Sequence, residues 1–365
     1  MGMYNFPSKD KKIFIETGKV GELGIVGQSD TSSQFYYYTV GYLEAANSII
    51  KTLLRKQKKE EAKISYQTQE DLNCAVLPVC FLYRQYLELA LKDIYLQYSN
   101  DTREAKTAFL NSASHKLCEI WNSAKPVLES VIEGKDEEFA LENLDAYIKE
   151  FNEKDPTSFS FRYPIDKELN CIHLTETKIN LRNLMRRMNE IESFLSSVLP
   201  LLDIEKDILQ SNNYRQEAIL QRDNEKFELA LKLFDKSMLI RIKFQGDNHP
   251  DIAILHIDIA HTCLLMRDFK NALAHYFNAI KLIEEGTSEK FPSLFIPYRK
   301  IGLIYEIQED FKKAIEFYEK AIIVSDREWG EKNPRTLELK EDIATIKNKS
   351  CLNCGRFAEG GMGVV

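Results

Sequence analysis

The sequence predicts an all-α protein: an N-terminal bundle of helices followed by a short superhelix of stacked helix pairs. Two observations predict this fold class. From residue 34 onward, apolar residues return every three or four positions through most of the chain, which is the period of a helix buried on one face. In the last third, Pro250, Pro292 and Pro334 stand 42 residues apart, so this part of the chain is a repeat.

Length and composition limit the classes of protein. The 365 residues suffice for two domains, each with its own core. The 49 basic and 56 acidic residues give a net charge of −7, so the bulk charge predicts neither a nucleic-acid nor an anionic-membrane partner. No window approaches the roughly 20 apolar residues of a membrane span, and the first residues lack the apolar core of a secretory signal. We therefore expect a cytoplasmic protein with no membrane partner.

The N-terminal domain is expected after an irregular arm at residues 1–33 and extends over 34–200. Its helices are predicted at 35–57, 71–99, 103–112, 115–132, 136–152 and 176–199. Between the last two, Pro156, Pro164 and alternating aromatic residues predict a short extended excursion or hairpin. Pro200 is expected to end the last helix, because proline lacks the backbone donor that a helix interior needs.

The repeats are predicted over 211–349, as three helix pairs and a capping helix at 335–349. The step of 42 residues also links small residues in the first helix of each unit, namely Ala218, Ala260, Gly302 and Ala344. It links aromatic residues that begin the second helices, namely Phe227, Phe269 and Phe311. A small side chain lets two helices approach closely where an aromatic ring fills the gap, which is typical of stacked helix pairs.

These repeats resemble the tetratricopeptide repeat, in the 42-residue form of kinesin light chain-like proteins. The third unit carries the pattern in full, with Tyr298, Gly302, Tyr305, Ala314, Tyr318 and Ala321. The first and second units depart from it, because Gln221 and Cys263 stand where the pattern prefers an aromatic residue. The resemblance implies a concave face that binds a protein or peptide. Candidate groove residues are Asn212, Arg215, His256 and Arg299, each of which could equally be an ordinary exposed helix side chain.

In the N-terminal domain, Arg84, Glu88 and Lys92 are four residues apart, so they form one polar stripe on an otherwise apolar helix. The ordinary interpretation is an intrahelical ladder of ion pairs. A different interpretation starts from two further motifs, the segment SHKLCEIW at 114–121 and the segment FRYP at 161–164.

Together the three motifs resemble the HEPN-like helical domains of bacterial proteins, over residues 34–199. The resemblance implies a bundle of four to six helices. Active ribonucleases of that group carry a histidine four to six residues after an arginine on one helix, and no histidine follows Arg84 in this way. His115 is the nearest candidate for acid–base chemistry, and Arg162 is a second basic candidate. The alternatives are a structural histidine at the start of a helix and a salt bridge that fixes a loop.

Other motifs are incomplete. Cys351 and Cys354 have the spacing of a zinc knuckle, but no second pair is near, so a complete site would need another chain. The alternative is that residues 350–365 form a flexible tail. Neither a phosphate-binding loop nor a nucleophile elbow is present, so we expect no cofactor.

The leading functional hypothesis is a protein- or peptide-binding scaffold or sensor that acts through the repeat groove, with the bundle as an oligomerisation or regulatory module. We expect a homo-oligomer and no clear enzymatic activity. The alternative is a metal-independent ribonuclease or RNA-binding effector of a bacterial antiviral defence or toxin system. A third possibility is a ligand-responsive regulator in which a signal peptide binds the groove and changes the dimer.

Overall fold

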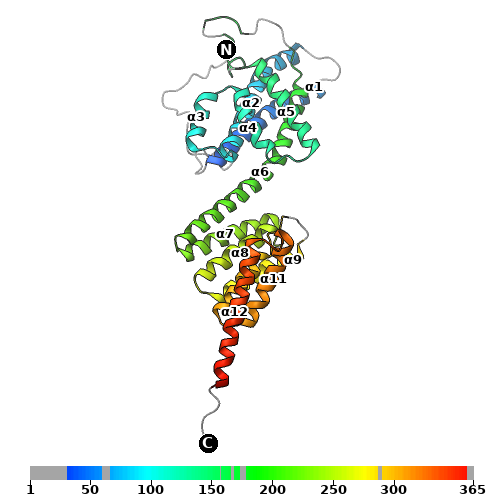
Figure 1. Cartoon of the computed structure of the whole chain (residues 1–365). Helices are drawn as coiled ribbons and strands as arrows, with labels where there is room; N and C mark the ends of the chain where they lie inside the picture. Colours follow the sequence, from blue (N-terminus) through cyan, green and yellow to red (C-terminus); the bar gives the residue numbers. More distant parts are fainter. Residues whose placement is uncertain are drawn as a thin grey trace, which may run out of the picture. The chain divides into compact units, whose positions relative to one another are not determined.

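The computed structural model describes residues 31–59, 66–156, 158–165, 168–172, 178–286 and 290–359. These residues form two compact units, which divide after Leu202 (Figure 1). Nearly all of the described residues are helical, and the one strand-like pairing among them is an isolated antiparallel bridge between Ile165 and Cys171. The prediction of an all-α fold is confirmed.

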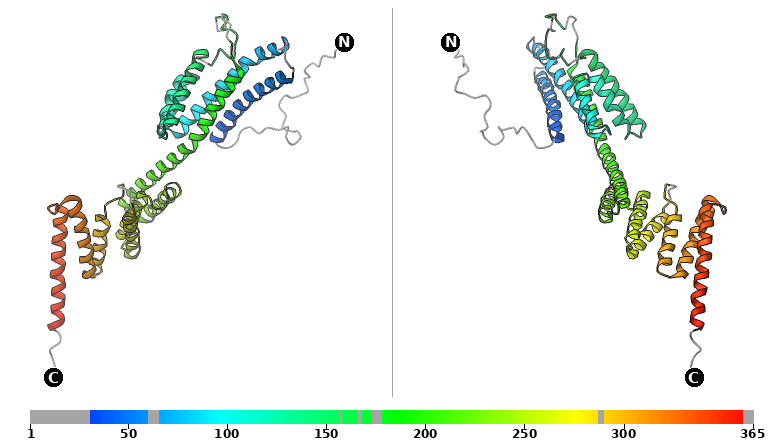
Figure 2. Two further views of the ribbon diagram at one scale, coloured as in Figure 1. Left: turned by 90° about the vertical axis from the view of Figure 1, so that its right-hand side faces the viewer. Right: turned by 60° about the vertical axis from the view of Figure 1, so that its left-hand side comes forward.

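The first unit contains five helices and the beginning of a sixth. They are α1 (Thr31–Lys59), α2 (Tyr66–Tyr98), α3 (Arg103–Ala113), α4 (Leu117–Glu129), α5 (Lys135–Lys154) and α6 (Leu181–Asp223). α1 runs beside α2 (Figure 2). A chain of polar contacts crosses three helices, since Tyr83 of α2 donates to Asn47 of α1 at 2.7 Å and Asn47 donates to Asn189 of α6 at 3.1 Å.

The core of this unit is centred on α2. Tyr83, Leu87 and Leu91 are fully buried there, and Trp121 of α4 and Met188 of α6 pack in the same cluster. Contrary to the expectation that no segment approaches a membrane span, one of the described helices, α2, is long and apolar enough to cross a membrane by length and composition alone. The core helix of a bundle passes the same test, and α2 has that place here.

The segment between α5 and α6 is organised by one buried carboxylate. Asp155 accepts hydrogen bonds from the backbone N–H of Phe159 at 2.7 Å and of Ser160 at 2.9 Å, which closes a turn directly after α5. Beyond it, the bridge between Ile165 and Cys171 gives the segment the hairpin-like character expected from its alternating aromatic residues. Residues 173–177 lie outside the described part of the chain.

Pro200 does not end a helix, contrary to expectation. It lies inside α6, which continues to Asp223 and supplies the first helix of the repeats. Leu195, Val198 and Leu202 lie on one buried face before and after the proline, while its own ring is exposed. Packing along that face therefore offsets the loss of one backbone hydrogen bond.

The second unit is a stack of helix pairs (Figures 1 and 2). After the last part of α6 it contains α7 (Phe227–Gln245), α8 (Pro250–Leu265), α9 (Phe269–Glu285), α10 (Phe295–Ile307), α11 (Phe311–Trp329) and α12 (Pro334–Glu359). The three second helices begin at the three phenylalanines that the sequence analysis placed there.

The turn within each pair has the same backbone conformation. Glu225, Arg267 and Glu309 adopt positive φ angles of 60°, 60° and 62°. The next residue donates its backbone N–H across the end of the first helix, as Lys226 does to Gln221 at 2.9 Å. This is the pattern of a helix that closes with a left-handed residue, and it starts the second helix at once.

The small and the aromatic residues that recur every 42 positions lie in the interior of the repeat unit. Ala218, Ala260 and Gly302 are buried, whereas Ala344 is exposed because no second helix follows it among the described residues. Phe234, Tyr276 and Tyr318 of the second helices are buried as well.

α10 begins at Phe295, and Ser293 Oγ accepts a hydrogen bond from the backbone N–H of Phe295 at 3.1 Å. The end of the last helix differs from the one predicted. α12 continues to Glu359, past residue 349, so the stretch from 350 to 359 is helical where a flexible tail was expected. Residues 360–365, and residues 1–30 of the arm, lie outside the described residues.

Candidate functional site

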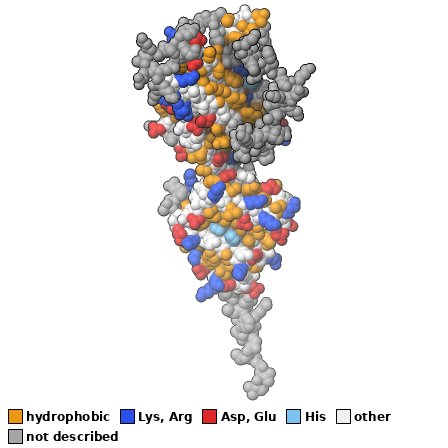
Figure 3. All heavy atoms as spheres, turned by 180° about the vertical axis from the view of Figure 1, so that it is seen from behind, with side chains coloured by type: hydrophobic (Ala, Val, Ile, Leu, Met, Phe, Trp, Pro, Cys, Tyr) orange, Lys and Arg blue, Asp and Glu red, His pale blue; other side chains and the backbone are white. Residues whose placement is uncertain are grey.

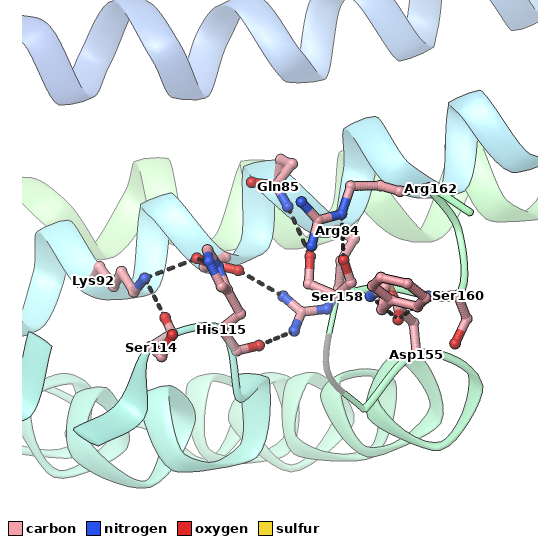
Figure 4. A network of polar contacts seen from close by, with 11 residues as sticks. Arg84, Gln85, Lys92, Ser114, His115, Asp155, Ser158, Ser160 and Arg162 are labelled. Carbon is pink, nitrogen blue, oxygen red and sulfur yellow. Dashed lines mark hydrogen bonds and ion pairs between the residues drawn. The ribbon is translucent and has the colours of Figure 1, made fainter. Parts of the chain in front are cut away.

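The polar stripe on α2 forms a cluster of charges around Glu88. Figure 4 shows Arg84, Lys92 and His115 of this cluster. Its carboxylate accepts from Arg84 Nη1 at 3.2 Å and from Lys92 Nζ at 2.7 Å. His115 Nδ1 lies 2.8 Å from Glu88 Oε1, and since a carboxylate only accepts, this nitrogen is the donor. The structure therefore brings Arg84, Glu88, Lys92 and His115 together.

The same cations hold the junction between α3 and α4. Arg84 Nη2 donates to the backbone oxygen of His115 at 2.5 Å, and Lys92 Nζ donates to that of Ser114 at 2.5 Å. Ser114 has an unusual backbone conformation, with φ of 43° and ψ of −104°. Such a conformation persists where surrounding contacts fix it, and the two cations supply them.

Burial determines what this cluster can do. The Arg84 side chain is 0% exposed and that of Glu88 is 3% exposed, whereas the His115 side chain is 53% exposed. Burial lowers the pKa of Arg84, and the adjacent Glu88 charge opposes that effect. Arg84 Nε is buried without a hydrogen-bond partner among the described residues. Arg84 and Glu88 thus join elements of the bundle, and the imidazole of His115 is the part of the cluster that faces solvent.

Arg162 lies in an adjacent set of contacts. Its Nε donates to the backbone oxygen of Ser158 at 2.5 Å, and Ser158 Oγ accepts from Gln85 Nε2 at 3.0 Å. The guanidinium carbon stands 6.0 Å from the ring centre of Phe81 and 5.6 Å from that of Tyr163. The hydrogen bond of Arg162 therefore lies within its own loop, and Arg162 reaches α2 through the ring of Phe81, where the sequence analysis offered a salt bridge.

The sequence analysis missed Asp155, which is fully buried and contributes to the electrostatic environment of Arg84. A signal for it exists in the sequence. An aspartate directly before a proline and two nearby serines is typical of a turn closed by a side-chain acceptor. The sequence pattern predicts the turn, but it does not predict that the turn lies close to α2.

In the repeat unit, the first helices carry a surface that we call the first-helix face, made of Arg215, Asp258, His261, Arg299, Lys300 and Glu338. Ion pairs link successive helices across it. Arg215 Nε lies 2.7 Å from Asp258 Oδ2, which joins α6 to α8, and Arg299 Nη2 lies 2.6 Å from Glu338 Oε1, which joins α10 to α12. Two of the four predicted groove residues are therefore on this face.

The middle of the first-helix face contains His261 and Lys300, and Lys300 contributes to the electrostatic environment of His261. Burial first, and then the positive charges of Lys300 and Arg222, lower the pKa of His261 to about 4. Lys300 is half-buried, and its pKa is lowered first by burial and then by the neighbouring Arg299. Within the described part of the chain, no carboxylate forms an ion pair with Lys300.

The other two predicted groove residues are engaged inside the unit. Asn212 Oδ1 accepts from Arg241 Nη2, in a buried network where Ser211 and Ser237 exchange hydrogen bonds. His256 Nδ1 lies 2.9 Å from His275 Nδ1 of α9. Both residues therefore hold first helices against second helices.

Asp258 and Lys300 were missed, although the sequence carries a signal for them. They stand 42 residues apart, in a column with Gln216 and Asp342, and every member of this column is polar. Figure 3 shows charged, histidine and hydrophobic side chains mixed on one face of the repeat unit.

Cys351 and Cys354 lie in the helical backbone of α12, but their side chains lie outside the described residues, so the zinc hypothesis stays a prediction.

Comparison with known proteins identifies the kind of repeat. Residues 209–285 match the family model described as "Tetratricopeptide repeat". The chain is similar to "Clustered mitochondria protein homolog" of Culex quinquefasciatus, with 25% identity over 127 residues. That match covers 35% of this chain and 9% of the relative, so the chain spans less than a tenth of that protein. The match to the tetratricopeptide repeat agrees with the stacked helix pairs.

Proposed function

We propose that this chain is a scaffold or sensor that binds a protein or peptide through the first-helix face of its repeats. Tetratricopeptide repeats are generally protein-binding units, and the match lies within this part of the chain. The observation that carries the proposal is the half-buried Lys300 beside His261, without a carboxylate partner among the described residues. A partly buried cation of this kind gains most from a partner that supplies an acceptor.

The repeats suit such a role for a physical reason. A stack of helix pairs presents a preformed surface, so a partner does not have to bear the entropy cost of ordering it. The ion pairs between α6 and α8 and between α10 and α12 keep the first helices in register. We propose that the repeats belong to the 42-residue, kinesin light chain-like form and act in the cytoplasm.

The test selects peptides from a random library on the purified full-length chain and measures their affinity for variants. Lys300→Ala and His261→Ala should weaken the selected peptides by about tenfold or more, which corresponds to about 1.4 kcal/mol. Lys320→Ala is the matched control, because Lys320 is an exposed lysine of a second helix that pairs with Glu316. Equal affinity of all variants, with thermal melts that confirm folding, would contradict the proposal.

For the bundle we propose an oligomerisation or regulatory role, with the HEPN-like resemblance as its basis. Sedimentation of the full-length chain over a range of concentrations tests the oligomer. A monomer at all concentrations would exclude oligomerisation through this unit.

A second candidate function is RNA binding or cleavage by the bundle, as in a defence or toxin system. The observation that favours it is the pairing of His115 with Glu88. Because Nδ1 donates to the carboxylate, Nε2 of the neutral imidazole is an acceptor on a half-exposed ring. The complete burial of Arg84 counts against it, since a buried guanidinium does not reach a phosphate. An RNA cleavage assay with wild type and His115→Ala decides, and cleavage that persists in His115→Ala would exclude this mechanism.

A further inference from the structure

A cavity of about 380 Å³ lies in the first unit, and its lining includes none of the residues of the Glu88 cluster. Residues of α5 and α6 form its walls, and Cys80 of α2, Phe161 and residues 178–180 complete the lining. Small-molecule sites in proteins have volumes of roughly 300–1,000 Å³ and occur between the helices of bundles. The cavity therefore has the size of a ligand site, and the function proposed for the repeats does not use it.

Most of the lining is apolar. Phe151 of α5 faces Leu184, Met188 and Ile191 of α6. Met188 and Ile191 belong to the buried core, so the cavity reaches the interior of the bundle. A bound molecule with an apolar part of matching size would cover these side chains. Removing apolar surface from water stabilises a complex by roughly 25 cal/mol per Å².

The charges in the lining are predominantly positive. Lys154, Lys178 and Arg187 are basic, and Glu150 is the acidic residue among the lining side chains. Arg187 Nη1 donates to the hydroxyl of Tyr147 at 3.0 Å and lies 2.8 Å from Glu190, which is not in the lining. Arg187 Nε is buried without an acceptor among the described residues. The basic side chains of the lining therefore favour an anion.

We propose that this cavity binds a small organic anion that has an apolar body, such as an aromatic or aliphatic carboxylate or sulfonate. The anionic group lies at Arg187 and Lys154, and the body packs on Leu184 and Met188. The cationic lining gives the charge preference, and the apolar walls give most of the affinity.

The test compares two probes on the full-length chain. 8-Anilinonaphthalene-1-sulfonate carries an anionic group on an aromatic body, and N-phenyl-1-naphthylamine has a closely similar body without the sulfonate. We expect the sulfonate to bind at a single site and at least about tenfold more tightly than the neutral probe. Binding raises the melting temperature if the probe occupies the folded protein. Failure of the sulfonate to bind, or equal affinity of the two probes, would overturn the proposal.

Two variants assign the charge preference. Arg187→Gln should weaken the sulfonate by about tenfold and leave the neutral probe unchanged. Arg186→Gln is the matched control, because Arg186 is the preceding residue of α6, is exposed, and does not line the cavity. Equal affinity of both variants for the sulfonate would overturn the assignment. Leu184→Trp, which fills the cavity from a half-buried position, should abolish binding of both probes.

The position of the bound probe is tested with methionine methyl resonances. Met188 lines the cavity, whereas Met185, three residues earlier on α6, does not. In the full-length chain labelled with ¹³C at methionine methyl groups, the sulfonate should shift the Met188 signal and leave that of Met185 in place. Binding without a shift of Met188 would place the probe elsewhere and overturn the proposal, and thermal melts confirm that each variant is folded.

Discussion

Gly302 of α10 lies against the ring of Tyr318 of α11, and a Cβ built on Gly302 would stand 2.6 Å from Tyr318 Cδ1. The corresponding positions in the first two repeats are alanines, Ala218 and Ala260, and both are fully buried. The third pair of helices therefore packs too closely for even a methyl group at this position.

Gly302→Ala should lower the free energy of unfolding by about 1–3 kcal/mol, because the aromatic ring has to move. This loss exceeds the gain of up to about 1 kcal/mol that alanine brings to a helix. Gly41→Ala in α1 is the matched control: Gly41 is exposed, a Cβ there meets nothing within 4 Å, and we expect a gain. Urea unfolding followed by circular dichroism measures both. Equal stability of the two variants would contradict the close packing.

Glu88→Gln should destabilise the bundle by about 3–5 kcal/mol, because it leaves the buried Arg84 without its counter-charge. Glu119→Gln provides the comparison. Glu119 pairs with Lys116 on the surface at 2.8 Å, and exposed pairs of this kind contribute about 0–1 kcal/mol. The measurement is again urea unfolding. A loss in Glu88→Gln no larger than in Glu119→Gln would mean that the cluster does not hold the bundle together.

The repeat unit should lose stability as the pH falls from about 6.5 towards 5. Burial lowers the pKa of His256 to about 4, and the pKa of His261 is lowered to about 4 as well. A histidine with an ordinary pKa of about 6.5 when unfolded takes up its proton first in the unfolded state, so stability is complete above that pH and decreases below it. We expect the melting temperature to fall by several degrees over this range.

A double variant separates this effect from that of other groups. His256 and His275 occupy the positions that Tyr298 and Phe317 hold in the third repeat, 42 residues later. The variant His256→Tyr/His275→Phe should therefore fold and should show a weaker dependence of melting temperature on pH between 6.5 and 5. The same dependence in this variant and in wild type would show that the pair is not responsible.

Pro200→Ala should raise the stability by about 1–3 kcal/mol, because alanine restores a backbone donor in the interior of α6. The proline ring is exposed, so little packing is lost with it. Pro334→Ala is the control, since Pro334 is the first residue of α12, where no donor is needed. We expect little change there in thermal melts. A loss of stability in Pro200→Ala would show that α6 needs the proline.

The repeats could be predicted in detail because their chemistry is local and recurs. Each second helix begins at a phenylalanine, and the prediction relied on the offset alone to place Phe227, Phe269 and Phe311. The continuity of α6 through Pro200 was not predicted, since tertiary packing on both sides of the proline overrides its local preference.

The candidate sites were predictable only in part. The spacing of Arg84, Glu88 and Lys92 showed that they share one side of a helix, but it could not show that Ser114 and His115 would be brought to them from another element. The contacts of Arg162 could not be predicted from the sequence either, because its partners are a backbone oxygen and two aromatic rings. Contacts between distant segments depend on the whole fold, and periodicity reports only the local part of it.

Glu225, Arg267 and Glu309 close the three turns in a left-handed conformation that suits glycine better than a residue with a side chain. A residue with a side chain loses about 1–2 kcal/mol in this conformation. Because each of these residues lies in a different repeat, glycine at all three should add its separate gains. Substitutions in these turns should therefore raise the stability of the repeats, and they would leave the core and the first-helix face unchanged.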